Sequence, residues 1–313
     1  MRRRALTAAF VLAALGEAAA AQAQEPQAKP RELRVMSYNI KHGQTNTPCT
    51  QPPRIPGQDP FPDCNLNLQA SIDVIRAQDP DIVGMEEIDR FWARSGYVDE
   101  PAEIAAGLGM EHYCYAANLN HPADSHSSIP HQYGVLIVSR FPILECTNTL
   151  LRKATSNAEQ RGLLKARINV RGVPLQFYTT HLHTAQADRL LQTEDIAVVI
   201  DAAPEGPKVL VGDFNARSTF TTTVPEMLPI YARFLDAWRE APLPDADNPN
   251  GFTSPARLVG NPTSRIDYVF VTSGVDVTGT RVPIDPQTRL AADHYPVVSD
   301  IALPGSGVGI GRK

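Results

Sequence analysis

The sequence predicts a mixed α/β fold, and three observations favour it. Among 313 residues, 42% are hydrophobic and 20% are charged, which is typical of a globular protein. Segments with strand and helix spacing alternate near the N-terminus and then give way to a β-rich middle. No internal repeat, low-complexity linker or change of composition divides residues 24–303, so we expect a single domain over that range.

The first 23 residues have the pattern of a secretory signal peptide. Arginines at 2–4 precede an apolar run from Ala5 to Leu15, and small residues end at Ala21-Gln22-Ala23, an Ala-x-Ala-like cleavage site. A membrane-spanning helix needs about 17 or more apolar residues, and this run is shorter. We therefore expect a secreted protein, periplasmic or extracellular.

The charge balance of the chain is acidic, with a formal net charge of −5. Removal of the arginine-rich residues 1–23 makes the mature chain more acidic still. An acidic protein gains little from nonspecific attraction to phosphate groups, so tight nonspecific binding to nucleic acid is not expected.

All four cysteines, Cys49, Cys64, Cys114 and Cys146, follow the predicted cleavage site. In an exported chain, an even number of cysteines predicts disulfides, and four cysteines allow three pairings. We favour Cys49–Cys64, which closes a proline-rich loop, and Cys114–Cys146, which joins two neighbouring strand-like segments. A zinc site is the alternative, but no two cysteines have the spacing of two to four residues usual for such sites.

The chain opens with a βαβ-like pattern. Residues Leu33–Ile40 read as a strand, and 41–65 form a long proline-rich loop. A helix follows, with apolar residues at 68, 72 and 75, and the Asp-Pro-Asp sequence at 79–81 ends it. A short apolar strand over Ile82–Met85 completes the unit.

The middle of the chain is β-rich and its second half is mixed. After a helix over 101–108, strands are expected at Glu111–Ala117, Tyr133–Ser139, Ile143–Leu151, Leu163–Val170 and Leu175–Thr180, with Arg171-Gly172 as a hairpin turn. Two such strand layers are expected to pack face to face. A second helix spans 185–202, with an expected apolar face of Ala187, Leu190, Leu191, Ala197 and Val198. Later strands are expected at Val209–Gly212, Arg265–Thr272 and Val297–Ala302, and residues 304–313 read as a flexible tail.

Polar clusters at the ends of these apolar runs mark the candidate site. They are Asn39, Glu86-Glu87, His181, Asp213-Phe214-Asn215, Ile266-Asp267-Tyr268 and Asp293-His294. Strand ends are where site residues gather in α/β folds, because the rigid sheet fixes their directions. Carboxylate and amide oxygens suit Mg²⁺, Mn²⁺ or Ca²⁺, and the two histidines can supply protons or hydrogen bonds to a phosphate.

The order of these clusters resembles that of the endonuclease/exonuclease/phosphatase superfamily. The motifs that carry the resemblance are Ser37-Tyr38-Asn39-Ile40, Glu86-Glu87-Ile88-Asp89, Thr180-His181-Leu182, Gly212-Asp213-Phe214-Asn215-Ala216, Ile266-Asp267-Tyr268 and Asp293-His294-Tyr295-Pro296. The superfamily includes pancreatic-type deoxyribonucleases, abasic-site endonucleases, neutral sphingomyelinases and inositol-polyphosphate phosphatases. The resemblance implies a two-sheet, four-layer α/β sandwich of the deoxyribonuclease-like type.

The resemblance also implies the metal ligands. Glu87 would be the main ligand of Mg²⁺, Mn²⁺ or Ca²⁺, with Asn39 beside it and Asp293 close to the ion. The superfamily usually has Gln where this chain has Glu86. We expect this additional carboxylate to face solvent rather than to add a ligand.

The catalytic and substrate-binding roles follow from the same resemblance. Asp213 with Asn215 would orient the attacking water or the scissile phosphate, Asp267 would pair with His294, and His181 would bond a phosphate oxygen. Arg161, near the start of a strand, can grip phosphate bidentately, although a surface role is equally open. Tyr133, at a strand opening, is expected to lie partly in the core and partly at the rim of the site.

These features favour a secreted, metal-dependent phosphoesterase, most consistent with a phosphodiesterase. The alternatives are an extracellular nuclease, a sphingomyelinase-like phospholipid phosphodiesterase, and a non-catalytic binding module of the same fold. The substrate is a phosphate ester, with nucleic acid or phospholipid as candidates, and no stable protein partner is inferred. The loop at 41–66 holds only Lys41 and Arg54 as lysine or arginine, which is few for a nuclease.

Overall fold

The computed structural model describes residues 31–49, 64–123, 128–219, 221–242 and 247–304. The predicted signal peptide at 1–23 and the predicted tail beyond Pro304 lie outside these residues. Within the described ranges, no helix combines the length and the apolar character needed to cross a membrane.

The first sheet has six strands in the order β11-β12-β1-β2-β4-β3. They are β1 (Arg31–Asn39), β2 (Ile82–Arg90), β3 (His112–His121), β4 (His131–Ser139), β11 (Asp276–Arg281) and β12 (Val297–Leu303). Strands β1 and β2 are parallel and the other neighbours are antiparallel. A parallel pair needs a crossover connection, which α1 (Leu68–Gln78) provides here. The predicted βαβ opening is therefore present.

The second sheet also has six strands, in the order β5-β6-β7-β8-β10-β9. They are β5 (Ile143–Leu150), β6 (Gly162–Val170), β7 (Val173–His181), β8 (Lys208–Asp213), β9 (Leu235–Asp236) and β10 (Asp267–Val271). The predicted turn between β6 and β7 has positive φ at both Arg171 (51°) and Gly172 (90°), as a two-residue hairpin of type I′ requires. Helix α3 (Gln186–Asp201) forms the crossover between β7 and β8, which are parallel.

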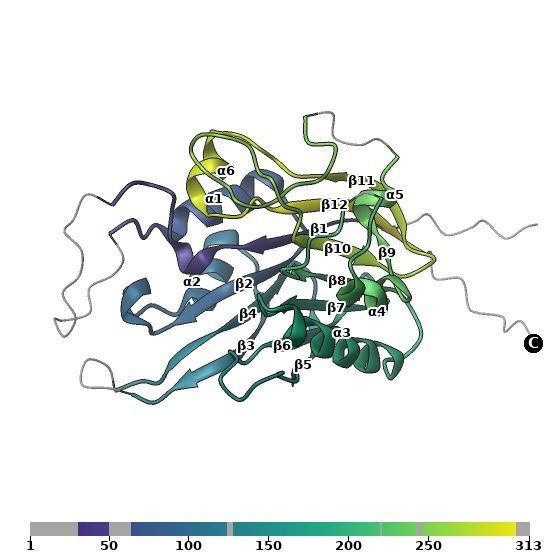
Figure 1. Cartoon of the computed structure of the whole chain (residues 1–313), viewed down its shortest axis with the longest axis horizontal. Helices are drawn as coiled ribbons and strands as arrows, with labels where there is room; N and C mark the ends of the chain where they lie inside the picture. The colour runs from purple at the N-terminus through teal and green to yellow at the C-terminus, as the bar shows by residue number, and fades with distance from the viewer. Residues whose placement is uncertain (1–30, 50–63, 124–127, 220, 243–246, 305–313) are drawn as a thin grey trace, which may run out of the picture.

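The two sheets pack face to face, and helices cover both outer faces (Figure 1). Apolar side chains such as Val35 and Ile82 from the first sheet meet Phe177 and Val209 from the second in one buried cluster. Helices α1, α2 (Glu100–Leu108) and α6 (Pro286–Ala291) cover the first sheet, and α3 with α4 (Leu228–Tyr231) covers the second. The short α5 (Ala237–Glu240) follows β9 directly. The predicted four-layer α/β sandwich is confirmed.

Both predicted disulfides are formed, and no described cysteine is free. The Cα atoms of Cys49 and Cys64 are 5.8 Å apart, and those of Cys114 and Cys146 are 6.0 Å apart. The second bond joins β3 to β5, which are edge strands of different sheets. It therefore connects the two layers of the sandwich.

The apolar face that we predicted for α3 is confirmed at Ala197, which is buried, and is wrong at Leu190 and Val198. Leu190 and Val198 are 41% and 68% exposed, whereas the buried residues of this helix include Asp188 and Arg189. A buried ion pair explains the difference, because Nη2 of Arg189 lies 2.7 Å from Oε1 of Glu226. Periodicity of apolar residues cannot reveal a helix face that is buried through paired charges.

Candidate active site

The strand ends that the sequence marked lie together in the structure. The register places Asn39 beside Glu86, His181 beside Asp213, and Asp213 beside Asp267. The first of these pairs belongs to one sheet and the others belong to the second sheet. The candidate site therefore lies where the ends of β1 and β2 meet those of β7, β8 and β10.

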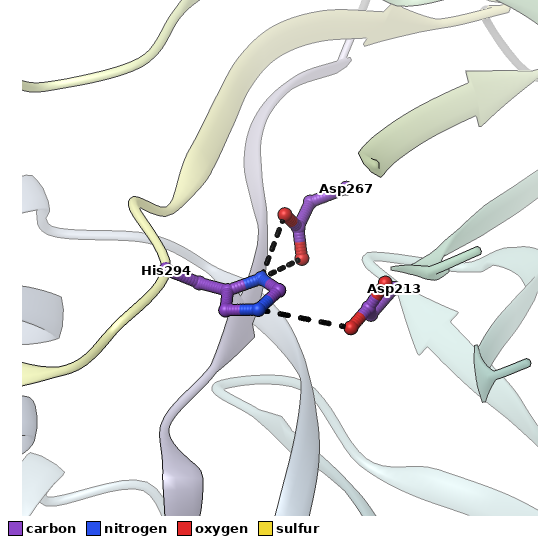
Figure 2. Close-up of side chains that lie close together, drawn as sticks. All are labelled: Asp213, Asp267 and His294. Atoms are coloured by element: carbon purple, nitrogen blue, oxygen red, sulfur yellow. Dashed lines mark hydrogen bonds and ion pairs between the residues drawn. The ribbon is translucent and has the colours of Figure 1, made fainter. Parts of the chain in front are cut away.

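His294 lies between two carboxylates from the second sheet (Figure 2). Its Nδ1 atom is 2.9 Å from Oδ2 and 3.1 Å from Oδ1 of Asp267. Its Nε2 atom is 4.0 Å from Oδ2 of Asp213. The hydroxyl of Thr253 donates a hydrogen bond to Oδ2 of Asp267. Thr253 and His294 together therefore hold the Asp267 carboxylate in one orientation.

The electrostatics of this group favour a protonated histidine. Burial alone lowers the pKa of His294, but the charge and hydrogen bond of Asp267 outweigh it and raise that pKa well above its usual range. Burial, together with repulsion from Asp267, raises the pKa of Asp213 to about 7. Asp213 can therefore exchange a proton near neutral pH.

Glu87 lies at a β-bulge, and the bulge separates the directions of two consecutive glutamates. The pairing of β2 with β4 shifts register between Glu86 and Ile88, and Glu87 has φ of 61°. A left-handed backbone is costly for a residue with a Cβ and occurs both in turns and at functional sites. The Nδ2 atom of Asn39 donates to Oε1 of Glu87 at 2.9 Å and to Oδ2 of Asp213 at 3.2 Å. Asn39 thus connects the two sheets at the site.

Glu86 does not face solvent, contrary to our expectation. Its side chain is fully buried, and the hydroxyl of Thr179 donates to its Oε1 atom at 2.7 Å. Burial raises the pKa of Glu86 well above its ordinary value. Strand alternation is the reason, because Ile82, Gly84 and Glu86 share the face of β2 that lies against the second sheet.

Asp293 forms an ion pair with Lys41 in the 3-10 turn η1 (Lys41–Gly43) that follows β1. The Nζ atom of Lys41 lies 3.1 Å from Oδ2 of Asp293, and Oδ1 of Asp293 is buried without a hydrogen bond. The backbone N–H of Lys41 donates to Oδ1 of Asn39 at 3.1 Å. The turn therefore holds both Asn39 and Asp293 in place.

His181 and Asn215 contact each other beside Asp213, and Nε2 of His181 lies 3.4 Å from Oδ2 of Asp213. The Nδ2 atom of Asn215 is 3.2 Å from Nε2 of His181, and the backbone N–H of Asn215 donates to Oδ1 of Asp213 at 2.8 Å. Burial lowers the pKa of His181 well below its usual value, and the positive charge of Arg161 acts in the same direction. A neutral His181 that accepts at Nε2 carries its proton on Nδ1, which is buried without a hydrogen bond.

Arg161 and Tyr133 line the next part of the site and are both buried, at 8% and 9% exposed. The Nη2 atom of Arg161 lies 3.0 Å from Oε1 of Glu159. Burial and the negative charge of Glu87 raise the pKa of Tyr133 well above its ordinary range, while the charge of Arg161 opposes this rise. Tyr133 and Arg161 are therefore both hydrogen-bond donors close to Glu87.

The donor set of the site suits a hard divalent cation. Asp213, Asp267 and His294 each offer one ligand atom, and these atoms lie within 4.8 Å of one another, so they could hold a metal ion. Both oxygens of Asp267 already accept from His294, however, which favours a proton-holding role for that pair. The carboxylate of Glu87 and the Oδ1 atom of Asp293, which forms no hydrogen bond, offer oxygen ligands of the kind that Mg²⁺ prefers.

Sequence reasoning missed several residues that support this site. Thr253 orients Asp267, Thr179 holds Glu86, and Glu159 pairs with Arg161. None of the three stands at a motif of the superfamily. Only Glu159 carried a signal, since a carboxylate two residues before a predicted phosphate-binding arginine is a potential partner for it.

Comparisons with known proteins agree with the fold. The Endonuclease/Exonuclease/phosphatase family profile matches residues 36–300. A solved endonuclease/exonuclease/phosphatase from Beutenbergia cavernae is 26% identical with a TM-score of 0.63, covering 89% of this chain and 73% of its own. A mannosyl-6-phosphatase from Bacteroides thetaiotaomicron is 16% identical with a TM-score of 0.59, and the match covers 86% of this chain and 99% of the phosphatase chain.

A truncated TDP2 from Caenorhabditis elegans has a similar fold at 18% identity and a TM-score of 0.55, covering 87% of this chain and 97% of its own. A comparison with curated proteins returned no match. Since the family profile extends over most of the sequence and includes all six polar clusters, the chain belongs to the endonuclease/exonuclease/phosphatase family.

Proposed function

We propose that this protein is an exported, divalent-metal-dependent phosphodiesterase. The observation that carries the proposal is the placement of His294 between Asp267 and Asp213, with Asn39 joining Asp213 to the carboxylate of Glu87. A buried acid–base group beside oxygen ligands for a hard cation is what hydrolysis of a phosphate ester requires.

The proposed metal ligands are Glu87, Asn39 and Asp293. When bound there, a divalent cation such as Mg²⁺ would supply positive charge to the phosphate oxygens and to the leaving oxygen. The Nδ2 atom of Asn39 donates to Glu87, and its Oδ1 atom accepts one hydrogen bond from Lys41 N–H, which leaves a second lone pair on that oxygen for a cation.

The proposed chemistry places an acid, a base and phosphate-binding donors around one position. Asp213, with its pKa of about 7, accepts a proton from the attacking water, and Asn215 fixes its Oδ1 atom. The imidazolium of His294, held by Asp267, is the acid: it faces the phosphate and gives its Nε2 proton to the leaving oxygen as the phosphorus–oxygen bond breaks. Neutral His181 donates from Nδ1, and Arg161 with Tyr133 binds the remaining phosphate oxygens.

Export is supported by the pairing of all four cysteines in two disulfides, because such bonds persist in oxidising compartments. The signal-peptide hypothesis concerns residues 1–23 and is tested by N-terminal sequencing of the exported protein. A mature N-terminus near Gln24 supports it, and an intact Met1 contradicts it.

Hydrolysis of bis(p-nitrophenyl) phosphate with Mg²⁺, before and after chelation, tests the proposed activity. His294→Ala should lose at least about 10²-fold in turnover, the low end of a general acid–base contribution. His112→Ala is the matched control, since His112 pairs with Ser139 at the far end of β3 and β4 and should keep full activity. A chelator-insensitive activity, or an active His294→Ala variant, contradicts the proposal. A panel of DNA, RNA, sphingomyelin and inositol phosphates then identifies the natural ester.

A further inference from the structure

Cationic side chains at the candidate site are each paired with a carboxylate. Three such ion pairs occur there among the residues that the structure describes, with nitrogen–oxygen distances of 3.1, 2.8 and 3.0 Å: Lys41–Asp293, Arg94–Asp89 and Arg161–Glu159. The charge that each cation can offer to an anionic substrate is therefore already partly compensated.

The Arg161–Glu159 pair differs from the other two. Asp293 is a proposed metal ligand, and Asp89 is a fully buried carboxylate that receives two hydrogen bonds from Arg94. Glu159 has neither role, and its side chain is 39% exposed, whereas that of Arg161 is 9% exposed. Because Arg161 is buried and the Oε1 atom of Glu159 that faces it is buried as well, this pair compensates the charge of Arg161 inside the protein.

Arg161 lies at the phosphate end of the site. In the pairing of β6 with β7, Leu163 is opposite Thr180, so Arg161, two residues earlier, lies beyond that pair, on the side where β7 ends at His181. Its carbonyl accepts from the backbone N–H of Leu151 at 2.9 Å, which fixes the backbone. Its Nε atom is buried and forms no hydrogen bond within the protein.

We propose that Glu159 determines which phosphate esters the site accepts, by compensating the charge of Arg161 so that a phosphodiester is preferred to a phosphomonoester. A diester phosphate carries one negative charge at neutral pH, whereas a monoester carries about −1.5 to −2. Arg161 can still donate hydrogen bonds to either ester. The second negative charge of the monoester is repelled by the Glu159 carboxylate. This inference rests on the proposed function and adds a residue that sets its substrate class.

The test compares kcat/KM for p-nitrophenyl phosphate and bis(p-nitrophenyl) phosphate at pH 8 with Mg²⁺. The wild-type protein should prefer the diester. Glu159→Gln should raise the monoester-to-diester ratio roughly tenfold, as expected for one extra unit charge at about 6 Å with an effective dielectric constant of about 40. Glu159→Asp retains the charge and should keep a ratio close to that of the wild type.

The matched control is Glu145→Gln. Glu145 pairs with Arg167 on the neighbouring strand, with Oε1 and Nη2 2.6 Å apart, and this pair joins β5 to β6, the two strands that the segment holding Glu159 and Arg161 connects. The substitution removes the same charge from the protein without changing Arg161, so the ratio should stay at the wild-type value. Titration calorimetry with inorganic phosphate provides a second measurement, in which Glu159→Gln should bind the dianion more tightly than the wild type.

The outcomes separate this inference from the proposed function. Three outcomes would overturn the role of Glu159: an unchanged ratio in Glu159→Gln, an equal change in Glu145→Gln, or a preference of the wild-type protein for the monoester. Each would still be consistent with a phosphoesterase. No hydrolysis of either ester refutes the proposed function. In that case unchanged phosphate binding in Glu159→Gln also refutes the inference, and tighter binding supports the charge compensation of Arg161.

Discussion

Asp267→Asn isolates the effect of one carboxylate on the buried His294. The substitution keeps the shape of the side chain and an oxygen that can accept from Thr253, but it removes the negative charge that lies 2.9 Å from Nδ1 of His294. An opposite charge at this distance typically changes a pKa by about 1–3 units. The pKa of His294 should therefore fall by about that amount in the variant.

The pKa change has a consequence for stability. The folded-state pKa of His294 is raised above its unfolded value, so the pair contributes stability that is fully present below about pH 6.5 and is lost as the pH rises through the folded pKa. One pKa unit corresponds to about 1.4 kcal/mol, so Asp267→Asn should lower the unfolding free energy by about 1.4–4 kcal/mol near pH 6. The difference should shrink at higher pH, where the variant also relieves the repulsion between Asp267 and Asp213.

Two measurements check this prediction. NMR titration of the His294 ring in metal-free protein gives its pKa directly, and urea unfolding at several pH values gives the stability difference. Asp188→Asn is the control, because Asp188 is a buried carboxylate that faces a different histidine, His183, with 3.4 Å between Oδ2 and Nδ1. It should leave the titration of His294 unchanged. An equal midpoint for His294 in wild type and Asp267→Asn, or a stability difference that grows with pH, would refute the reasoning.

Three further predictions concern the metal, the disulfide and the core. Glu87→Ala should lower Mg²⁺-dependent turnover by at least about 10²-fold with little change in unfolding free energy, as measured by ester hydrolysis and urea titration; near-normal turnover would exclude Glu87 as the main ligand. Replacing Cys114 and Cys146 by alanine should cost about 4 kcal/mol in unfolding free energy, since the bond closes a separation of 32 residues; an unchanged urea midpoint would contradict this. Gly84→Ala should destabilise the protein by about 1–3 kcal/mol, because its Cβ would lie too close to Val211; a wild-type melting temperature would show that the sheets can separate to accommodate it.

Much of the fold could be predicted because its strands are apolar runs with clear ends. Strand β8 is buried along its whole length, and its predicted range of 209–212 differs from the structure by one residue at each end. Strand β11 was not predicted. Its sequence alternates polar and small residues around Gly279, where the register also shifts, so it lacks a run of buried apolar residues.

The candidate site could be predicted as a set of residues but not as a geometry. The six clusters identified Asp213, Asp267 and His294 because their order along the chain is distinctive. Sequence could not reveal the bulge at Glu87, since a bulge depends on the register of a partner strand. The burial of Glu86 was missed for a different reason: the strand was predicted to end at Met85, whereas β2 continues to Arg90 and keeps Glu86 on the same inner face as Ile82 and Gly84.

The disulfide between β3 and β5 also controls how the sandwich can associate with other chains. Both strands are sheet edges, and β5 exposes nearly every side chain. An edge strand presents unpaired backbone groups on which another chain can add a strand. Because Cys114 and Cys146 connect the two edges, neither edge can separate from the sandwich without the other. We therefore expect reduction of this bond to let β3 and β5 move apart, so that each can pair with a strand of another chain. The chain should resist aggregation best in an oxidising environment.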